Sequence, residues 1–117
     1  MAEYLPIYKP GQAVTLKASA AITGGQLVEV SGSGTVQPAG AASTKVVGVA
    51  GFDAATNDPV TIYTSGPVHH VKASGAVTAG ATVAAAAGGA VASGTTAVVG
   101  LALTTAADGA DVRFLQK

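Results

Sequence analysis

Short apolar runs rich in β-branched residues recur along the chain, each bounded by glycine, proline, asparagine or serine. Runs of four or five residues that mix apolar with polar positions and end at such turn residues predict β-strands. The pattern predicts eight strands, at residues 13–17, 26–30, 45–49, 60–63, 68–72, 81–84, 97–101 and 111–115. The alanine run 84–87 is followed by two glycines and lacks a cap, so it predicts a loop or strand end and not a helix. We therefore expect an all-β fold, a small barrel or sandwich.

The order of these runs is doubled within the chain. Residues 17–25 (KASAAITGG) return as residues 72–80 (KASGAVTAG), and residues 46–50 (VVGVA) return as residues 98–102 (VVGLA). A solenoid or propeller needs roughly three or more units. Two units favour one domain built from two pseudo-symmetric β repeats.

The doubling sets the expected boundaries. We expect a single β domain at residues 12–117, with halves at about 12–64 and 68–117 related by a pseudo-two-fold axis. Two pairs of residues should then occupy equivalent buried positions: Ile22 with Val77, and Val47 with Val99. The stretches 31–44 and 88–96 are rich in Ser, Gly and Ala, and predict exposed loops.

Residues 1–11 stand outside the repeat and predict an extended N-terminal arm. They hold two of the three tyrosines and two of the five prolines of the chain. Proline removes a backbone donor and forbids helix continuation, so the arm favours extended geometry. Its tyrosine, leucine and isoleucine side chains still gain by burial, and the arm therefore needs a surface to lie on.

Charge and composition narrow the function. Six Lys and Arg residues balance six Asp and Glu residues, so no basic field draws nucleic acid or a membrane to the surface. Charged residues make up only 10% of the chain, against about 25–35% on the surface of a typical small soluble domain. We expect a partner or a second copy to cover part of this surface. No apolar run resembles a signal peptide or a membrane span.

The sequence offers few groups for chemistry. There is no cysteine, which excludes disulfides and thiolate sites. His69 and His70 are adjacent in a predicted strand and should point to opposite faces, so they cannot easily share one metal ion. Four aspartates, Asp53, Asp58, Asp108 and Asp111, lack the spacing of a calcium loop and are expected to cap turns. We expect no enzyme activity, no metal and no cofactor.

One pair of lysines recurs with the repeat. Lys17 and Lys72 each stand directly before Ala-Ser at equivalent places in the two halves. They are either paired contacts to carboxylates of a partner or solvated strand ends that blunt an exposed sheet edge. The second interpretation is the more economical of the two.

The chain resembles the small capsid cement, or head decoration, proteins of tailed bacteriophages. The resemblance runs over most of residues 9–117 and lies in the order of several blocks: PGQAVTL at 10–16, AITGGQLVEV at 21–30, VGVA at 47–50, ASGAVTAG at 73–80, VGLA at 99–102 and AADGADVRFL at 106–115. It implies a structural protein that binds the major capsid protein on the outer surface of the mature shell and stabilises it.

The resemblance also implies partners and contacts. It implies a homotrimer on the virion, made in the host cytoplasm. From the arm's own residues we expect a contact with that capsid, through Tyr4, Leu5, Pro6, Ile7, Tyr8 and Lys9: the apolar side chains can be buried in a groove while the backbone pairs with an exposed strand of the shell. The alternative is a fibre-associated or carbohydrate-binding β module, although aromatic platforms for a sugar are sparse in this sequence.

Overall fold

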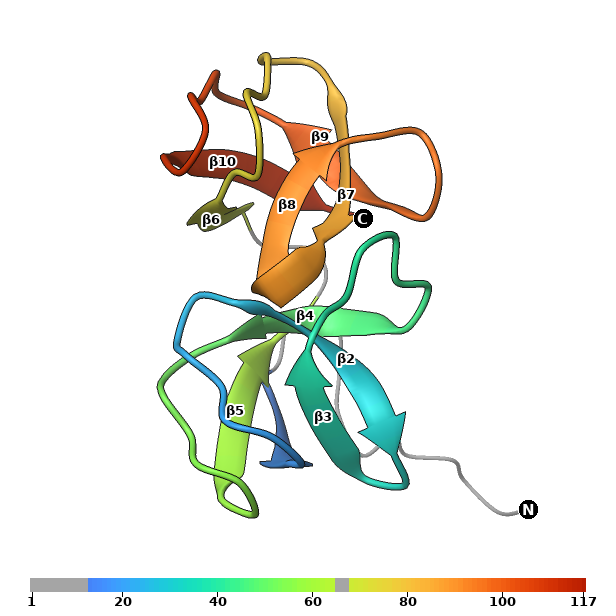
Figure 1. Cartoon of the computed structure of the whole chain (residues 1–117), viewed down its shortest axis with the longest axis vertical. Coiled ribbons are helices and arrows are strands. Elements are labelled where there is room, and N and C mark those ends of the chain that lie inside the picture. The colour runs from blue at the N-terminus through green and yellow to red at the C-terminus, as the bar shows by residue number, and fades with distance from the viewer. Residues whose placement is uncertain (1–12, 65–67) are drawn as a thin grey trace, which may run out of the picture.

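A computed structural model of the chain describes residues 13–64 and 68–117, and within these ranges nearly all regular structure is β. Its elements are β1 (Val14–Ala18), β2 (Leu27–Gly32), β3 (Thr35–Pro38), β4 (Val46–Ala50), β5 (Pro59–Tyr63), β6 (Val68–Lys72), β7 (Thr82–Ala86), the 3₁₀ turn η1 (Ala87–Gly89), β8 (Ala90–Ser93), β9 (Val98–Ala102) and β10 (Asp111–Gln116). Figure 1 shows β2 to β5 gathered at one end of the long axis and β6 to β10 at the other. The all-β prediction is confirmed.

The first half is a closed five-stranded barrel. Its strands follow the order β1-β3-β2-β4-β5, and β1 closes the ring by pairing antiparallel with β5 and parallel with β3. Alternate residues of these strands point inward, as the period of two requires. Val28, Val36 and Ile62 are fully buried inside the barrel, and burial of each such side chain contributes about 1.5–3 kcal/mol.

The second half repeats this order with one difference. Its strands follow the order β6-β10-β9-β7-β8, which runs round the ring in the opposite direction to the order given for the first half. Strand β6 therefore corresponds to β1, and β8 corresponds to β3. The ring is closed between β6 and β8 by an isolated parallel bridge, Ala73↔Val91, beside which Ser74 N donates to Val91 O at 2.7 Å. The matching closure in the first half is the two-residue ladder Lys17↔Thr35 and Ala18↔Val36. Ser19 N makes the equivalent bond to Val36 O at 2.8 Å in the first half, and Lys17 N makes a further one to Gly34 O at 3.2 Å. No such bond from Lys72 N is present among the described residues, so the seam of the second barrel is open beside Lys72.

The hydrogen bonds confirm the doubling. Ile22 and Ala54 exchange backbone hydrogen bonds at 2.8 and 2.9 Å, and Val77 and Ala106 do the same at 2.9 Å. A side-chain bond also recurs with different chemistry, because Asp53 Oδ1 accepts from Gly24 N in the first half and Thr105 Oγ1 accepts from Ala79 N in the second. The two halves thus share a main-chain frame.

Two glycines mark a close approach of strands in both halves. A Cβ added at Gly48 would lie 2.1 Å from the carbonyl oxygen of Tyr63, and one added at Gly100 would lie 2.2 Å from that of Leu115. Both glycines sit beside a β-bulge, at which β2 shifts register on β4 and β7 shifts register on β9. Such bulges bend a strand and increase its twist, which helps a five-stranded sheet curl into a barrel.

The structure corrects two loop predictions. The stretch 31–44 contains β3, and the stretch 88–96 contains β8, each the second strand of a short hairpin. Both strands are only four residues long, and each has one fully buried residue, Val36 and Val91. Surrounding Ser, Gly and Ala residues hid these strands from a pattern search.

The equivalent buried positions are confirmed in three cases of four. Ile22, Val77 and Val99 are buried. Val47 is only half-buried and packs at the margin of the first barrel's core, so its predicted burial was wrong.

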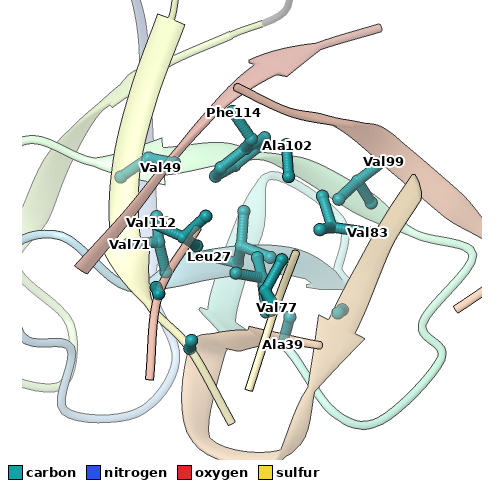
Figure 2. Packing of buried hydrophobic residues seen from close by; sticks show 14 residues of the cluster. Leu27, Ala39, Val49, Val71, Val77, Val83, Val99, Ala102, Val112 and Phe114 are labelled. Carbon is teal, nitrogen blue, oxygen red and sulfur yellow. The ribbon is translucent and has the colours of Figure 1, made fainter. Parts of the chain in front are cut away.

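Apolar contacts join the two halves. Figure 2 shows Leu27, Ala39 and Val49 of the first half in one cluster with second-half residues such as Val71 and Phe114. Phe114 is fully buried and is the largest side chain in this cluster. The second core therefore extends into the first half and does not end at the boundary between them.

Backbone and amide groups join the halves as well. Several hydrogen bonds between described residues join the halves: Gly89 N to Ala39 O at 3.0 Å, Ala42 N to Ala85 O at 2.8 Å, Gln26 Nε2 to Gly88 O at 2.9 Å, Gln116 Nε2 to Val47 O at 3.3 Å, and His69 Nε2 to Thr64 O at 3.2 Å. Position 89 requires glycine, because an added Cβ would lie 2.7 Å from Gln26 Cβ. The hairpin turn of β7 and β8 is thus held on the first half.

Candidate interaction surface

A cleft of about 490 Å³ lies between the two halves, at the open seam of the second barrel. One wall is β6, through His70, Val71 and Lys72, and the facing walls are two glycine-rich turns. The residues that line these turns are Thr23, Gly24, Gly25 and Gln26 before β2, and Gly88, Gly89 and Ala90 at the start of β8, with Asp111 beside them. Backbone and small side chains therefore form most of the cleft surface.

The edge of β6 faces this cleft. Ala73 N donates to Ala110 O at 2.8 Å, and the register of β6 on β10 pairs Val71 with Val112 and Lys72 with Asp111. Antiparallel pairs alternate between residues that bond to the partner strand and residues whose backbone groups point away. The amides of His70 and Lys72 therefore point away from β10. No hydrogen bond to either amide is present within residues 13–64 and 68–117.

Few charged side chains stand at the cleft. His70 Nδ1 lies 3.3 Å from Asp111 Oδ2, with both side chains largely exposed, so this pair contributes little to stability. Lys72 is exposed at the end of β6, and Lys17 is exposed on β1. Neither lysine forms an ion pair with any described residue, which fits the solvated strand ends expected from sequence.

The two adjacent histidines point to opposite faces, as predicted. His69 is buried, whereas His70 is exposed. His69 Nε2 lies 2.8 Å from Gln116 Oε1 and 3.2 Å from Thr64 O. Both oxygens are acceptors, so Nε2 carries a hydrogen and donates it. The ring also lies 5.8 Å from that of Phe114, and His69 therefore acts as a core residue that anchors the start of β6.

Three carboxylates bind backbone amides of turns. Asp53 Oδ1 accepts from Gly24 N, and Asp108 Oδ1 accepts from Gly75 N, each at 2.8 Å. The turn role expected for these two aspartates is confirmed. The sequence did not single out Glu29, whose Oε1 accepts from Gly40 N at 2.8 Å.

The environment of Glu29 favours its charged form. The bond from Gly40 N, and then bonds from the side chains of Gln37 and Ser43, hold the pKa of this carboxyl below its ordinary value. A pKa lowered in this way means that the carboxylate stabilises the folded state. Its role is to fasten the loop between β3 and β4.

The described residues hold no group of three or more His, Asp or Glu side chains that could bind a metal ion. Within the same residues, no helix has the length and hydropathy needed to cross a bilayer. Several large apolar side chains are instead exposed: Val30, Phe52, Tyr63, Val68, Val98 and Leu103. Exposed apolar area of this kind suits contact with another protein.

The six residues expected to contact a capsid, Tyr4, Leu5, Pro6, Ile7, Tyr8 and Lys9, lie outside the described residues. The cleft was not predicted from sequence. Its lining residues are mostly Gly, Thr and Ala, which carry no chemical signature, and they come from four separate segments. Of the residues that the sequence analysis singled out, His70, Lys72 and Asp111 line the cleft.

Comparison with known proteins agrees with this architecture. The model of one protein family, described as phage cement protein, matches residues 8–116. Among solved structures, the head fiber gp8.5 N base in bacteriophage phi29 is similar, with a TM-score of 0.74 and 18% sequence identity. The match covers 91% of this chain and 93% of that one, and at this identity it shows a shared fold. No curated protein sequence matches the chain.

Proposed function

Because this chain belongs to the phage cement protein family, and so is a structural protein of the phage capsid, we propose that it binds the major capsid protein as a homotrimer without any catalytic activity. In this proposal it is made in the host cytoplasm and then covers the outer surface of the mature shell. The family match, which extends from residue 8 to residue 116, is the observation that carries the proposal.

The surface supports a role in assembly. Six large apolar side chains are exposed on the described part of a chain with few charges, and each would gain by burial against another protein. The exposed alanine, serine, threonine and glycine residues lose little side-chain entropy when covered. Such a surface binds at low entropic cost to a large partner or to a second copy.

The test is binding to shells that lack the protein. Purified chain is mixed with undecorated, expanded capsids, and bound protein is measured by co-sedimentation across a concentration series. We expect saturable binding at a fixed number of copies per shell, and decorated shells should withstand heating to a higher temperature. Absence of saturable binding would contradict the proposal.

We propose further that residues 4–9 form part of the capsid contact. At a concentration at which the protein is monomeric, deleting residues 2–9 should leave the melting temperature almost unchanged, because these residues precede β1 (Val14–Ala18) and the barrel ladders. The same deletion should weaken capsid binding at least tenfold in the co-sedimentation assay. Unaltered affinity would show that the barrels alone make the contact.

The alternative of a carbohydrate-binding module has a direct test. A glycan array probed with the labelled protein should give no saturable signal if the protein acts only on the capsid. Clear binding of one class of sugar would favour a second role at the host surface.

A further inference from the structure

The open seam of the second barrel carries an inference about assembly that depends on the proposed trimer. We infer that this seam receives the N-terminal segment of a second copy of the chain, which adds as an extended strand to the free edge of β6. In this mode of recognition, main-chain hydrogen bonds supply affinity, and the flanking walls select side chains of suitable size.

The two halves show why the seam is open. In the first barrel, Lys17 N donates to Gly34 O at 3.2 Å, and this bond helps to close the ring. Gly89 occupies the place of Gly34 in the repeat, but its amide donates to Ala39 O of the first half. Ser74 N still donates to Val91 O of β8 at 2.7 Å, but the Lys72 amide has no acceptor among the described residues, and the seam is open beside it.

The seam has the dimensions and walls that an extended chain needs. Its volume of about 490 Å³ lies within the range of about 300–1,000 Å³ typical of ligand clefts. Glycines such as Gly24, Gly25 and Gly88 line it opposite His70 and Lys72. A Cβ added at Gly25 or Gly88 would meet nothing within 4 Å, so a backbone can approach these two glycines closely.

The N-terminal sequence matches a single free edge. Residues 1–12 lie outside the described residues, and when extended they span at most about 40 Å. Pro6 and Pro10 are four positions apart, so in an extended chain both missing amides fall on the same edge. Leu5, Ile7 and Lys9 keep a complete row of donors and acceptors on the other edge. Such a strand can pair with a neighbouring strand on one side only, because the prolines lack backbone donors on the other side.

The proposed trimer identifies the source of the strand. A three-fold ring needs two different, complementary patches on each chain, because its contacts run head to tail. The N-terminal segment and the seam are two such patches, whereas a segment that filled the seam of its own chain would link no copies. Side chains alternate along a strand, so pairing through this edge puts Tyr4 and Tyr8 on one face together, available for the proposed capsid contact.

Cysteine cross-linking tests the inference, since the chain has no cysteine of its own. Leu5→Cys and Lys72→Cys are made as separate proteins, one lengthened by a C-terminal tag, then mixed and oxidised. A disulfide requires Cα atoms within about 7 Å, so we expect a mixed dimer on a non-reducing gel. Lys17→Cys is the matched control, because it has the equivalent place on β1 but its strand edge is already paired with β3.

The outcomes separate the alternatives. A mixed dimer with Lys72→Cys, at least tenfold more abundant than with Lys17→Cys, supports strand exchange. Equal yields with both lysine variants would overturn it. The mixture is also oxidised on decorated shells, and absence of the mixed dimer both free and on shells would overturn it too. A double variant, Leu5→Cys with Lys72→Cys, that yields only a disulfide within one chain would place the segment in its own seam, against the inference.

A peptide separates this edge from nonspecific contact. A synthetic peptide of residues 1–12 is titrated against protein that lacks residues 2–9. N-methylation of Ile7 removes a donor from the pairing edge and should weaken binding at least tenfold, whereas N-methylation of Tyr8 should change it less than twofold. Equal effects would refute the predicted edge. Saturable capsid binding without cross-linking would leave the proposed function intact and remove only this inference.

Discussion

Substitution of Gly100 by alanine tests whether the close strand approach holds the second barrel together. The added Cβ would lie 2.2 Å from the carbonyl oxygen of Leu115 and 2.9 Å from Cδ2 of Phe114. Real Cβ atoms essentially never approach other atoms within 3.0 Å, so β9 and β10 must separate by several tenths of an ångström. Phe114 is fully buried and cannot move aside without disturbing the shared core.

Overpacking of this kind costs about 1–3 kcal/mol, and more where a backbone must move. In a domain of about this size, each kcal/mol lowers the melting temperature by about 4 °C or more. We therefore expect Gly100→Ala to lower it by at least 4–12 °C. The assay is thermal and urea unfolding followed by circular dichroism at one fixed protein concentration, because assembly would also affect the midpoint.

Gly94→Ala is the matched control in the same half. A Cβ there would meet only Ala84 Cβ, at 3.4 Å, which is ordinary contact. Its midpoint should stay near that of the unchanged protein or rise slightly, because alanine restricts the unfolded chain. Gly48→Ala, at the equivalent place in the first barrel, should behave like Gly100→Ala. If Gly100→Ala unfolds at the same midpoint as Gly94→Ala, the argument from strand approach is wrong.

Three other predictions concern the shared frame. Ile22→Ala and Val77→Ala should each destabilise the fold by about 1–3 kcal/mol, because both residues are buried at equivalent bridges; urea midpoints measure this. The Glu29 carboxylate, whose pKa is lowered in the folded state, stabilises the fold at pH values above its unfolded-state pKa of about 4.5. This stabilisation is lost as the pH falls through the folded-state pKa. Glu29→Gln should flatten that loss in unfolding curves from pH 7 to 3. Residues 12–117 should unfold in one calorimetric transition, since one core cluster spans both halves.

Most of the architecture could be predicted because it depends on local signals. The repeat of Lys-Ala-Ser and Val-Val-Gly blocks predicted that both halves share one plan, and adjacent His69 and His70 had to face opposite ways. The bulges at Gly48 and Gly100 could not be foreseen. They arise from contacts between strands that are distant in sequence.

The short strands β3 and β8 were missed for a related reason. Each owes its place to one buried valine and to main-chain bonds with a neighbouring strand, and neither contribution gives a periodic pattern. The cleft was not predicted because the glycine and alanine residues that line it have small side chains or none, and such residues give no sequence signal. At Val47 the repeat predicted too much burial. Val47 matches its repeat partner Val99 in sequence but is less buried than Val99.

The main-chain frame common to both halves frees their side chains to diverge. The anchor supplied by a carboxylate at Asp53 is supplied by a hydroxyl at Thr105, with the same backbone geometry around it. The fold of each half therefore requires an acceptor at this position and not one particular residue, so the two halves can acquire different surface chemistry without a change of backbone.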